Sequence, residues 1–343
     1  MPGNSKDKQT TSYPICSDLN KIASHLKEHG VCVIPNVFSS VECDSWMKEI
    51  LSCIETLSGN KVDHNKPTEW SGDELPPQTR YGMHQYLVNN LKPIWEIRRD
   101  PRMKGIFQPV YTELKGKNID EFVCSIDGVS IQPNVSRDIG KEKDWAHLDQ
   151  TSRDDVFKCV QGQVVLTNTK ASFRASPRIH KHFIEIMEMC GVPDTNRNFY
   201  KFDDDQIENI MTDIVLPNNI PYQIPINAEK GSVILWLSST AHSSMSARFK
   251  ELPTIEDPFK GWRGVAYVCY RPKEDFSTDQ LNALEDCLEA NHGTNHWSDM
   301  VFPEFNNRKG VSISPNMQRL LQNPKQVYEE LNFKPDKSFF LIE

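Results

Sequence analysis

The feature that most restricts the fold of this chain is a series of short β-like segments in its second half. From residue 122 onward, apolar and β-branched residues come in runs bounded by Gly, Pro, Asn and Asp. The runs read FVCSIDGVSI, CVQGQVVLTN, YQIPIN, GSVILWL and GVAYVCY. Short strands with frequent turn residues are typical of an antiparallel barrel or sandwich rather than of alternating βαβ units. We therefore expect a β core in this part of the chain.

Helical patterns flank the β region on both sides. Apolar residues recur at helical spacing within residues 19–115 and again within 276–335. We expect a flexible tail over 1–18 and a single domain over 19–335. In that domain, N- and C-terminal helices flank a β core over about 120–275. The predicted fold class is thus α+β, with a mainly β core.

Local signals place the ends of the N-terminal helices. Asp18 is available as the N-cap of a first helix and Gly30 as its stop. A second helix is expected over about 40–57. Residues 92–115 are predicted to form a helix that breaks near Pro101, because proline disfavours the helical conformation at the residue before it.

Composition excludes several classes of protein. The 343 residues include 39 Lys and Arg against 47 Asp and Glu, a net charge of −8 without clustered basic residues, which argues against nucleic-acid binding. No segment approaches the ~18 consecutive apolar residues of a membrane span. Nine cysteines without a CxxC pair predict reduced thiols and a cytoplasmic location. We expect a small-molecule substrate and no protein partner.

One pair of residues suggests a metal site. His147 and Asp149 lie two apart in an extended segment, so their side chains point to the same face. His242 closes the β-like run GSVILWLSSTAH, about 90 residues later. Two histidines and one carboxylate, with other coordination positions open, are the ligands of non-haem Fe(II) oxygenases. An isolated HxD pattern is weak evidence, and the following histidine strengthens it.

A cation is the other element that such chemistry needs. Arg263 opens the strand-like run WRGVAY, downstream of His242. A guanidinium can bind a carboxylate through two parallel hydrogen bonds, which lysine cannot reproduce. The alternative is a surface arginine at the end of a strand.

At this point the sequence resembles the phytanoyl-CoA dioxygenase family of Fe(II)/2-oxoglutarate oxygenases. The matching segments, in chain order, read HGVCVIPNVFSSVE, RYGMHQ, IWEIRRDPRMKGIF, FVCSIDGVSI, WAHLDQ, CVQGQVVLTN, SPRIHKHF, GSVILWLSSTAHSS and WRGVAYVCY. The resemblance covers roughly residues 20–300. It implies a double-stranded β-helix, a jelly-roll related to the cupins, with His147, Asp149 and His242 as iron ligands. It also implies that Arg263 binds the distal carboxylate of 2-oxoglutarate.

The resemblance suggests further site residues. Ser244 and Gln163 occupy positions that contact the co-substrate in relatives, although Ser244 can also be read as a plain loop serine. Gln150, His84 and Gln85 are expected to lie near the substrate.

One departure from the family pattern concerns the arginine. The 20 residues between His242 and Arg263 exceed the usual spacing, so a loop is inserted here. Arg248 and Arg271 therefore compete with Arg263 as the co-substrate anchor.

The predicted function is that of an Fe(II)/2-oxoglutarate-dependent dioxygenase. Such an enzyme uses O2 to hydroxylate a small organic substrate and converts 2-oxoglutarate to succinate and CO2. One alternative is a catalytically inactive jelly-roll that binds or scaffolds. Another is a related barrel that uses Zn or Mn for hydrolysis, since imidazole and carboxylate serve those metals too.

Several other conspicuous residues receive structural interpretations. Trp145 and Trp236 are expected to pack the barrel or its mouth. His296, in ANHGTNHW, is interpreted as a packing residue. The pair Asp127-Gly128 is predicted to form a hairpin turn.

Overall fold

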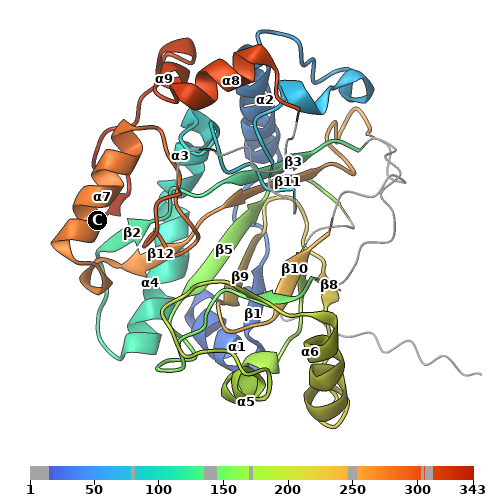
Figure 1. Cartoon of the computed structure of the whole chain (residues 1–343), viewed down its shortest axis with the longest axis vertical. Coiled ribbons are helices and arrows are strands. Elements are labelled where there is room, and N and C mark those ends of the chain that lie inside the picture. Colours follow the sequence, from blue (N-terminus) through green and yellow to red (C-terminus); the bar gives the residue numbers. More distant parts are fainter. Residues whose placement is uncertain are drawn as a thin grey trace, which may run out of the picture.

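The structure is a computed structural model that describes residues 15–78, 82–134, 145–169, 173–245, 253–302, 305 and 312–343. It combines antiparallel sheets with helices from both ends of the chain (Figure 1). Most of the tail predicted over 1–18 lies outside the described residues.

The first helix begins and ends where its sequence signals predict. A 3-10 turn (Leu19–Lys21) leads into α1 (Ile22–His29). The Asp18 carboxylate accepts a hydrogen bond from the N–H of Asn20, which satisfies a donor that the helix leaves unpaired. Gly30 adopts φ 73°, a left-handed conformation that glycine tolerates and that ends the helix.

The other N-terminal helices are also confirmed. Helix α2 (Ser40–Leu57) begins with a capping box, in which the side chains of Ser39 and Glu42 each bond the other's backbone N–H. The next stretch forms α3 (Lys92–Arg98) and α4 (Pro101–Lys115), and the break predicted at the proline separates them.

Two five-stranded antiparallel sheets form the core. The first has the order β1 (Val31–Ile34), β9 (Val233–Leu237), β5 (Val160–Val165), β11 (Arg263–Tyr267), β3 (Val129–Gln132). The second has the order β7 (Tyr200–Lys201), β4 (His147–Leu148), β10 (His242–Ser244), β6 (Phe173–Ala175), β8 (Ile224–Ile226). Their inner faces meet, since the rings of Phe173 and Trp236 lie 4.6 Å apart.

Strand β5 shows how residue alternation divides the first sheet into two faces. Val160 and Val164 join the apolar layer that includes residues of α1, α2 and α4. Val165 points the other way and packs against residues of the second sheet. Gln161 and Gln163 share the inner face with Val165, because alternate residues of a strand lie on one side. Polar side chains are therefore buried between the two sheets.

A third sheet consists of β12 (Tyr270–Pro272), β2 (Phe122–Cys124) and β13 (Leu341–Ile342). The hairpin predicted at Asp127-Gly128 is wrong, because β2 and β3 belong to different sheets and do not pair. The intervening residues instead carry the chain from one sheet to the other. Asp127 is fully buried there.

The remaining helices lie at the edges of the molecule. They are α5 (Phe183–Met189), α6 (Asp204–Asn209) with a π-helical extension (Ile210–Val215), α7 (Thr278–Glu289), α8 (Pro315–Gln322) and α9 (Gln326–Glu330). Helices α8 and α9 lie at the opposite end of the molecule from α5 and α6, and α7 lies along one side (Figure 1).

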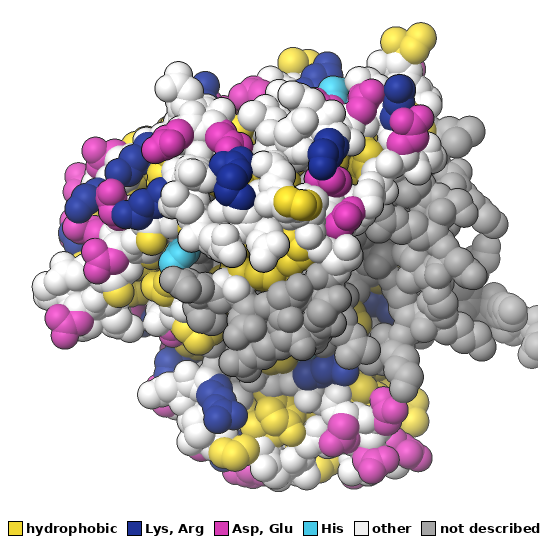
Figure 2. Space-filling view, turned by 45° about the horizontal axis from the view of Figure 1, so that its top comes forward, with side chains coloured by type: hydrophobic (Ala, Val, Ile, Leu, Met, Phe, Trp, Pro, Cys, Tyr) yellow, Lys and Arg dark blue, Asp and Glu magenta, His cyan; other side chains and the backbone are white. Residues whose placement is uncertain are grey.

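The surface mixes charges of both signs. Figure 2 shows Lys and Arg side chains interspersed with Asp and Glu over the upper part of the face in view. Within the described residues, no helix combines the length and the apolar composition that crossing a membrane requires.

Candidate metal centre

Pairing between two strands brings the three predicted ligands together. In the register of β4 and β10, His242 lies directly opposite His147, and Asp149 follows two residues after His147. The Nε2 of His147 lies 3.5 Å from Asp149 Oδ1, and the Nε2 of His242 lies 3.3 Å from Asp149 Oδ2. One donor atom from each residue lies within 4.8 Å of the other two. All three side chains are buried.

Neighbouring groups orient these side chains. His242 Nδ1 lies 2.9 Å from the carbonyl oxygen of Thr240. A carbonyl only accepts, so Nδ1 carries a hydrogen and Nε2 is the ring nitrogen that faces Asp149. Gln161 Nε2 donates to Asp149 Oδ2 at 3.0 Å. The His147 ring stacks on Trp145, with centroids 4.7 Å apart.

The electrostatics suit a cation. Burial and the neighbouring His242 ring lower the pKa of His147 to about 3, so this imidazole is neutral at physiological pH. Burial raises the pKa of Asp149, but the two imidazoles outweigh this effect and hold it below its usual value. A neutral imidazole and a carboxylate are the forms that bind metals. The Nε2 of His242 and a carboxylate oxygen of Asp149 also face each other, as two ligands of one cation would. The three residues therefore fit an iron site.

The candidate ligands line a large cavity. Its volume is about 560 Å³. The wall is rich in aromatic side chains and includes Trp145, Phe173, Phe199, Trp236, Trp297, Phe302 and Phe305. This volume and apolar wall are typical of a site for a small organic molecule.

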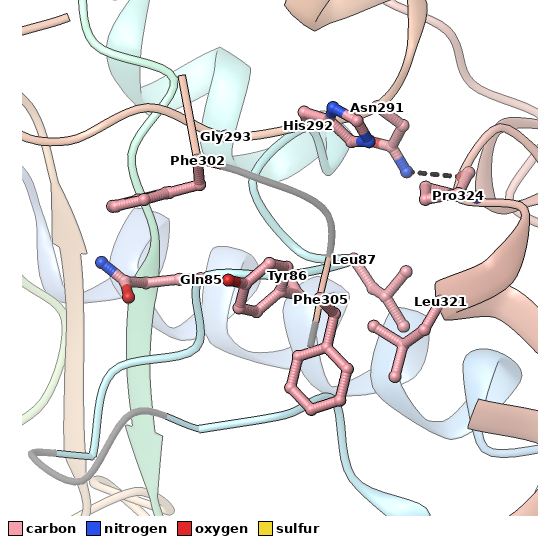
Figure 3. A pocket seen from close by; sticks show the side chains of 10 residues that line it. All are labelled: Gln85, Tyr86, Leu87, Asn291, His292, Gly293, Phe302, Phe305, Leu321 and Pro324. Atoms are coloured by element: carbon pink, nitrogen blue, oxygen red, sulfur yellow. Dashed lines mark hydrogen bonds between the residues drawn. The ribbon is translucent and has the colours of Figure 1, made fainter. Parts of the chain in front are cut away.

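A smaller pocket adjoins the cavity and shares part of its wall. Gln85, Tyr86, Phe302 and Phe305 line both spaces. Figure 3 shows Gln85 and Phe302 extending to the same side and the rings of Tyr86 and Phe305 close together. The centroids of these two rings are 5.2 Å apart, and the rings are nearly perpendicular. Gln85 therefore lines both spaces, and its place near a substrate stays a prediction.

Two other expected substrate residues lie outside the cavity wall. The ring nitrogens of His84 lie 2.8 Å from the Pro76 carbonyl and 2.8 Å from the Gln78 amide, and burial lowers its pKa to about 4. Gln150 donates to two backbone carbonyls and accepts from the Ser238 hydroxyl. The hydrogen bonds of both side chains hold neighbouring loops in place.

Arg263 and Gln163 lie on the inner face of the first sheet. Neither side chain lines the cavity. Both lie next to Tyr267, whose side chain does line it. Arg263 is fully buried and donates to the hydroxyls of Ser130 and Tyr267. Gln163 is paired in register with Tyr267, and within the described part of the chain both polar atoms of its buried amide lack hydrogen-bond partners. Ser244 is in the cavity wall itself.

The competing arginines differ from Arg263. Arg271 belongs to the third sheet, donates to the Trp297 carbonyl, and lies 3.8 Å from the carboxylates of Asp275 and Asp299. Its charge is therefore already compensated. Arg248 lies outside the described residues.

Sequence patterns did not predict the roles of three further residues. Gln161 holds the candidate ligand Asp149, Tyr267 connects Arg263 to the cavity, and His296 stands in the cavity wall. The alternation of β5 would place Gln161 beside Gln163. No local signal predicts the position of His296, which depends on a contact with Asp127 169 residues away.

Comparisons with known proteins support the fold. No family model matches the sequence. The Ava biosynthesis cluster protein O of Aspergillus versicolor is 22% identical over 271 residues, covering 76% of this chain and 80% of that protein.

Two solved structures match most of the chain. The hypothetical protein JW0805 from Escherichia coli has a TM-score of 0.53 at 13% identity, over 90% of this chain and 85% of that one. The DUF1479 protein GIG2 from Candida albicans has a TM-score of 0.50 at 17% identity, over 95% and 87%. At these identities the likeness shows a shared fold.

Proposed function

We propose that this protein is an Fe(II)/2-oxoglutarate-dependent dioxygenase that resembles the phytanoyl-CoA dioxygenase family. The observation that carries the proposal is the buried set His147, Asp149 and His242 at a cavity of about 560 Å³. Two imidazoles and one carboxylate occupy one side of a metal and leave the other positions for co-substrate and O2.

The order of the strands supports a double-stranded β-helix. Along the chain, β3, β4, β5 and β6 belong alternately to the first and second sheets, and so do β8, β9, β10 and β11, in the reverse order. This alternation winds the chain repeatedly between two facing sheets, as in a jelly-roll.

The surroundings of Arg263 support its role as the co-substrate anchor. A buried guanidinium is costly unless a negative group compensates it. No carboxylate lies within 4 Å of Arg263 among the residues that the structure describes, where it meets only hydroxyls. The distal carboxylate of 2-oxoglutarate would supply the missing charge and accept two hydrogen bonds.

Unpaired polar atoms between the sheets also fit a polar ligand. They are the Oε1 of Gln161, both amide atoms of Gln163, the Nε1 of Trp236 and the Nε of Arg263. Buried polar atoms without partners are uncommon in native proteins, and a bound ligand is one explanation for them. Because they lie on inner-facing positions between Asp149 and Arg263, we assign this space to 2-oxoglutarate.

Each part of the site then has a role. Bound Fe(II), with 2-oxoglutarate and O2, supplies the oxidation of an unactivated C–H bond as 2-oxoglutarate is converted to succinate and CO2. His147, Asp149 and His242 hold the metal, Arg263 and Tyr267 bind the distal carboxylate, and the aromatic cavity holds the substrate and excludes water. Hydroxylation of a small organic molecule is the expected outcome.

Anaerobic titration tests the proposal. Adding Fe(II) to the purified protein with 2-oxoglutarate should produce a weak visible charge-transfer band. Asp149→Ala should abolish the band, and Arg263→Ala should weaken 2-oxoglutarate binding. Asp154→Ala, which removes an exposed carboxylate paired with Lys158, is the control and should leave the band intact.

Arg271→Ala distinguishes the two described anchors. We expect it to leave 2-oxoglutarate affinity unchanged, because Arg271 already has carboxylate partners. A wild-type protein that forms no band would overturn the oxygenase proposal. A band lost in Arg271→Ala but kept in Arg263→Ala would exchange their roles.

A further inference from the structure

His296 occupies a distinctive place in the cavity wall. It lies after α7, and its ring centroid is 5.2 Å from that of Tyr267 and 6.2 Å from that of Trp236. These neighbours belong to the inner face of the first sheet, so the loop brings an imidazole to the space beside the candidate metal ligands. The ring contacts are with Tyr267 and Trp236, and the charge of His296 also interacts with Asp149.

A buried carboxylate fixes the orientation of this imidazole. Asp127 is fully buried, and its Oδ2 accepts a hydrogen bond from His296 Nδ1. Asp127 Oδ1 accepts from the backbone N–H of Gly128 at 2.7 Å. The carboxylate is therefore held in place, and the ring cannot rotate without breaking a charge-assisted bond.

The second ring nitrogen is left free to face the cavity. His296 Nε2 has no hydrogen-bond partner within the described part of the chain. It is also absent from the polar atoms that are both buried and unpaired, so it retains accessible surface. Because Nδ1 points to Asp127, Nε2 points away from that carboxylate and is available to a ligand.

The charge of His296 indicates what that ligand would be. Burial lowers the pKa of His296, but the Asp127 carboxylate, with a smaller contribution from Asp149, raises it more, to about 9. The ring is then protonated at neutral pH, and Nε2 is a donor. Among the described residues of the cavity wall there is no Lys or Arg, so the positive charge that an acidic ligand would meet there is that of His296.

The aromatic part of the cavity wall is suited to a flat, apolar ligand. The rings of Trp145, Phe199, Trp236, Trp297 and Phe302 surround the space. Aromatic walls stack on planar ligands and bury large apolar area. A charged group at one side of such a wall fixes how an acidic ligand is oriented.

We propose that His296, held by Asp127, binds the carboxylate of an aromatic or polycyclic substrate and orients it in the cavity. This inference rests on the proposed function, since it takes the cavity to be the active site. His296 is thus a specificity-determining residue.

Binding to metal-free protein tests the inference without activity. The probes are 1-naphthoate and its neutral counterpart 1-naphthamide, measured by calorimetry in the presence of a chelator. Hydrogen bonds to charged groups contribute more than those between neutral groups, so 1-naphthoate should bind about tenfold more tightly. Equal affinities in the wild-type protein would overturn the inference.

Variants assign the preference to the dyad. His296→Gln removes the charge and should abolish the preference, and Asp127→Asn should reduce it. His296→Lys restores a cation and should retain part of it. The matched control is His182→Gln, which breaks an exposed histidine–glutamate pair on the surface and should change nothing.

The outcomes separate this inference from the proposed function. A preference that persists in His296→Gln would show that another group binds the carboxylate and would overturn the assignment. Circular dichroism identifies variants that fail to fold. If His296→Gln does not fold, the preference measured in His296→Lys decides whether a cation at this position binds the carboxylate. The Fe(II) charge-transfer band is measured separately, so loss of the band would overturn the oxygenase and leave the dyad as a carboxylate-binding site.

Discussion

At the scale of single residues, the candidate ligands depend on partners from other strands. Asp149 receives a hydrogen bond from Gln161 of β5, and His242 is oriented by the Thr240 carbonyl. Such outer contacts fix the direction of metal ligands and tune their basicity. The HxD pattern predicts two ligands, but the group that orients the carboxylate lies 12 residues further along the chain.

Replacing Gln161 should therefore weaken metal binding. Gln161→Leu removes the 3.0 Å hydrogen bond to Asp149 and should lower Fe(II) affinity about 10- to 100-fold. The measurement is Fe(II) titration without 2-oxoglutarate. Gln163→Leu is the matched control, since its amide does not contact a ligand, and it should leave that affinity unchanged. Equal loss in both variants would contradict the role of Gln161.

At the scale of elements, the sequence signals at helix ends correspond closely to the structure. Asp18, Gly30 and Ser39 act through contacts with residues a few positions away, so a local pattern is sufficient to predict them. The short strands are different. The sequence predicts extended segments near residues 122–132, yet β2 and β3 enter different sheets. Turn residues report a change of direction and carry no information about the partner strand.

The capping box of α2 makes a pH-dependent contribution to stability. Arg102 and the Ser39 N–H lower the pKa of Glu42 from 4.5 to about 2. The folded pKa is below the unfolded one, so the stabilisation is present above pH 4.5 and is lost as pH falls towards 2. Glu42→Gln should thus be less stable than wild type at pH 7, with a smaller difference at pH 3. Chemical denaturation at both values measures this, and an unchanged difference would contradict it.

Replacing Ser39 provides a second test of the capping box of α2. Ser39→Ala removes the side-chain acceptor for the Glu42 N–H and should lower the free energy of unfolding by about 1 kcal/mol. Ser45→Ala, at an exposed position within the helix, is the control and should have little effect. Equal losses in the two variants would argue against the cap.

At the scale of the whole molecule, the helical layer packs against the outer face of the first sheet through small residues. A Cβ added to Gly162 would lie 2.7 Å from the Val268 carbonyl oxygen and 3.2 Å from the Phe107 ring of α4. The sheet and the helix approach this closely because glycine has no side chain. Strand β5, which contains Gly162, also buries its polar residues on the inner face of the sheet. The packing against the helices and the position of the site residues therefore depend on the same strand register.

Gly162→Ala should therefore be destabilising. A backbone oxygen cannot move aside as a flexible side chain can, and overpacking of this kind costs about 1–3 kcal/mol. Gly105→Ala, in the exposed interior of α4, meets nothing within 4 Å and should instead stabilise by about 0.5–1 kcal/mol. Denaturant unfolding of both variants checks the opposite signs. A neutral Gly162→Ala would contradict the close approach.

The sequence by itself determined the helix ends, the β character of the core, and the choice of His147, Asp149 and His242 as candidate ligands, because these depend on spacing and neighbouring residues. Tertiary structure alone decided which strands pair, and so brought His242 opposite His147. It also showed that Arg263 is buried with no carboxylate partner among the described residues while Arg271 has two, and it joined His296 to Asp127. Burial and distant contacts arise only when the sheets close on each other, and no local pattern records them.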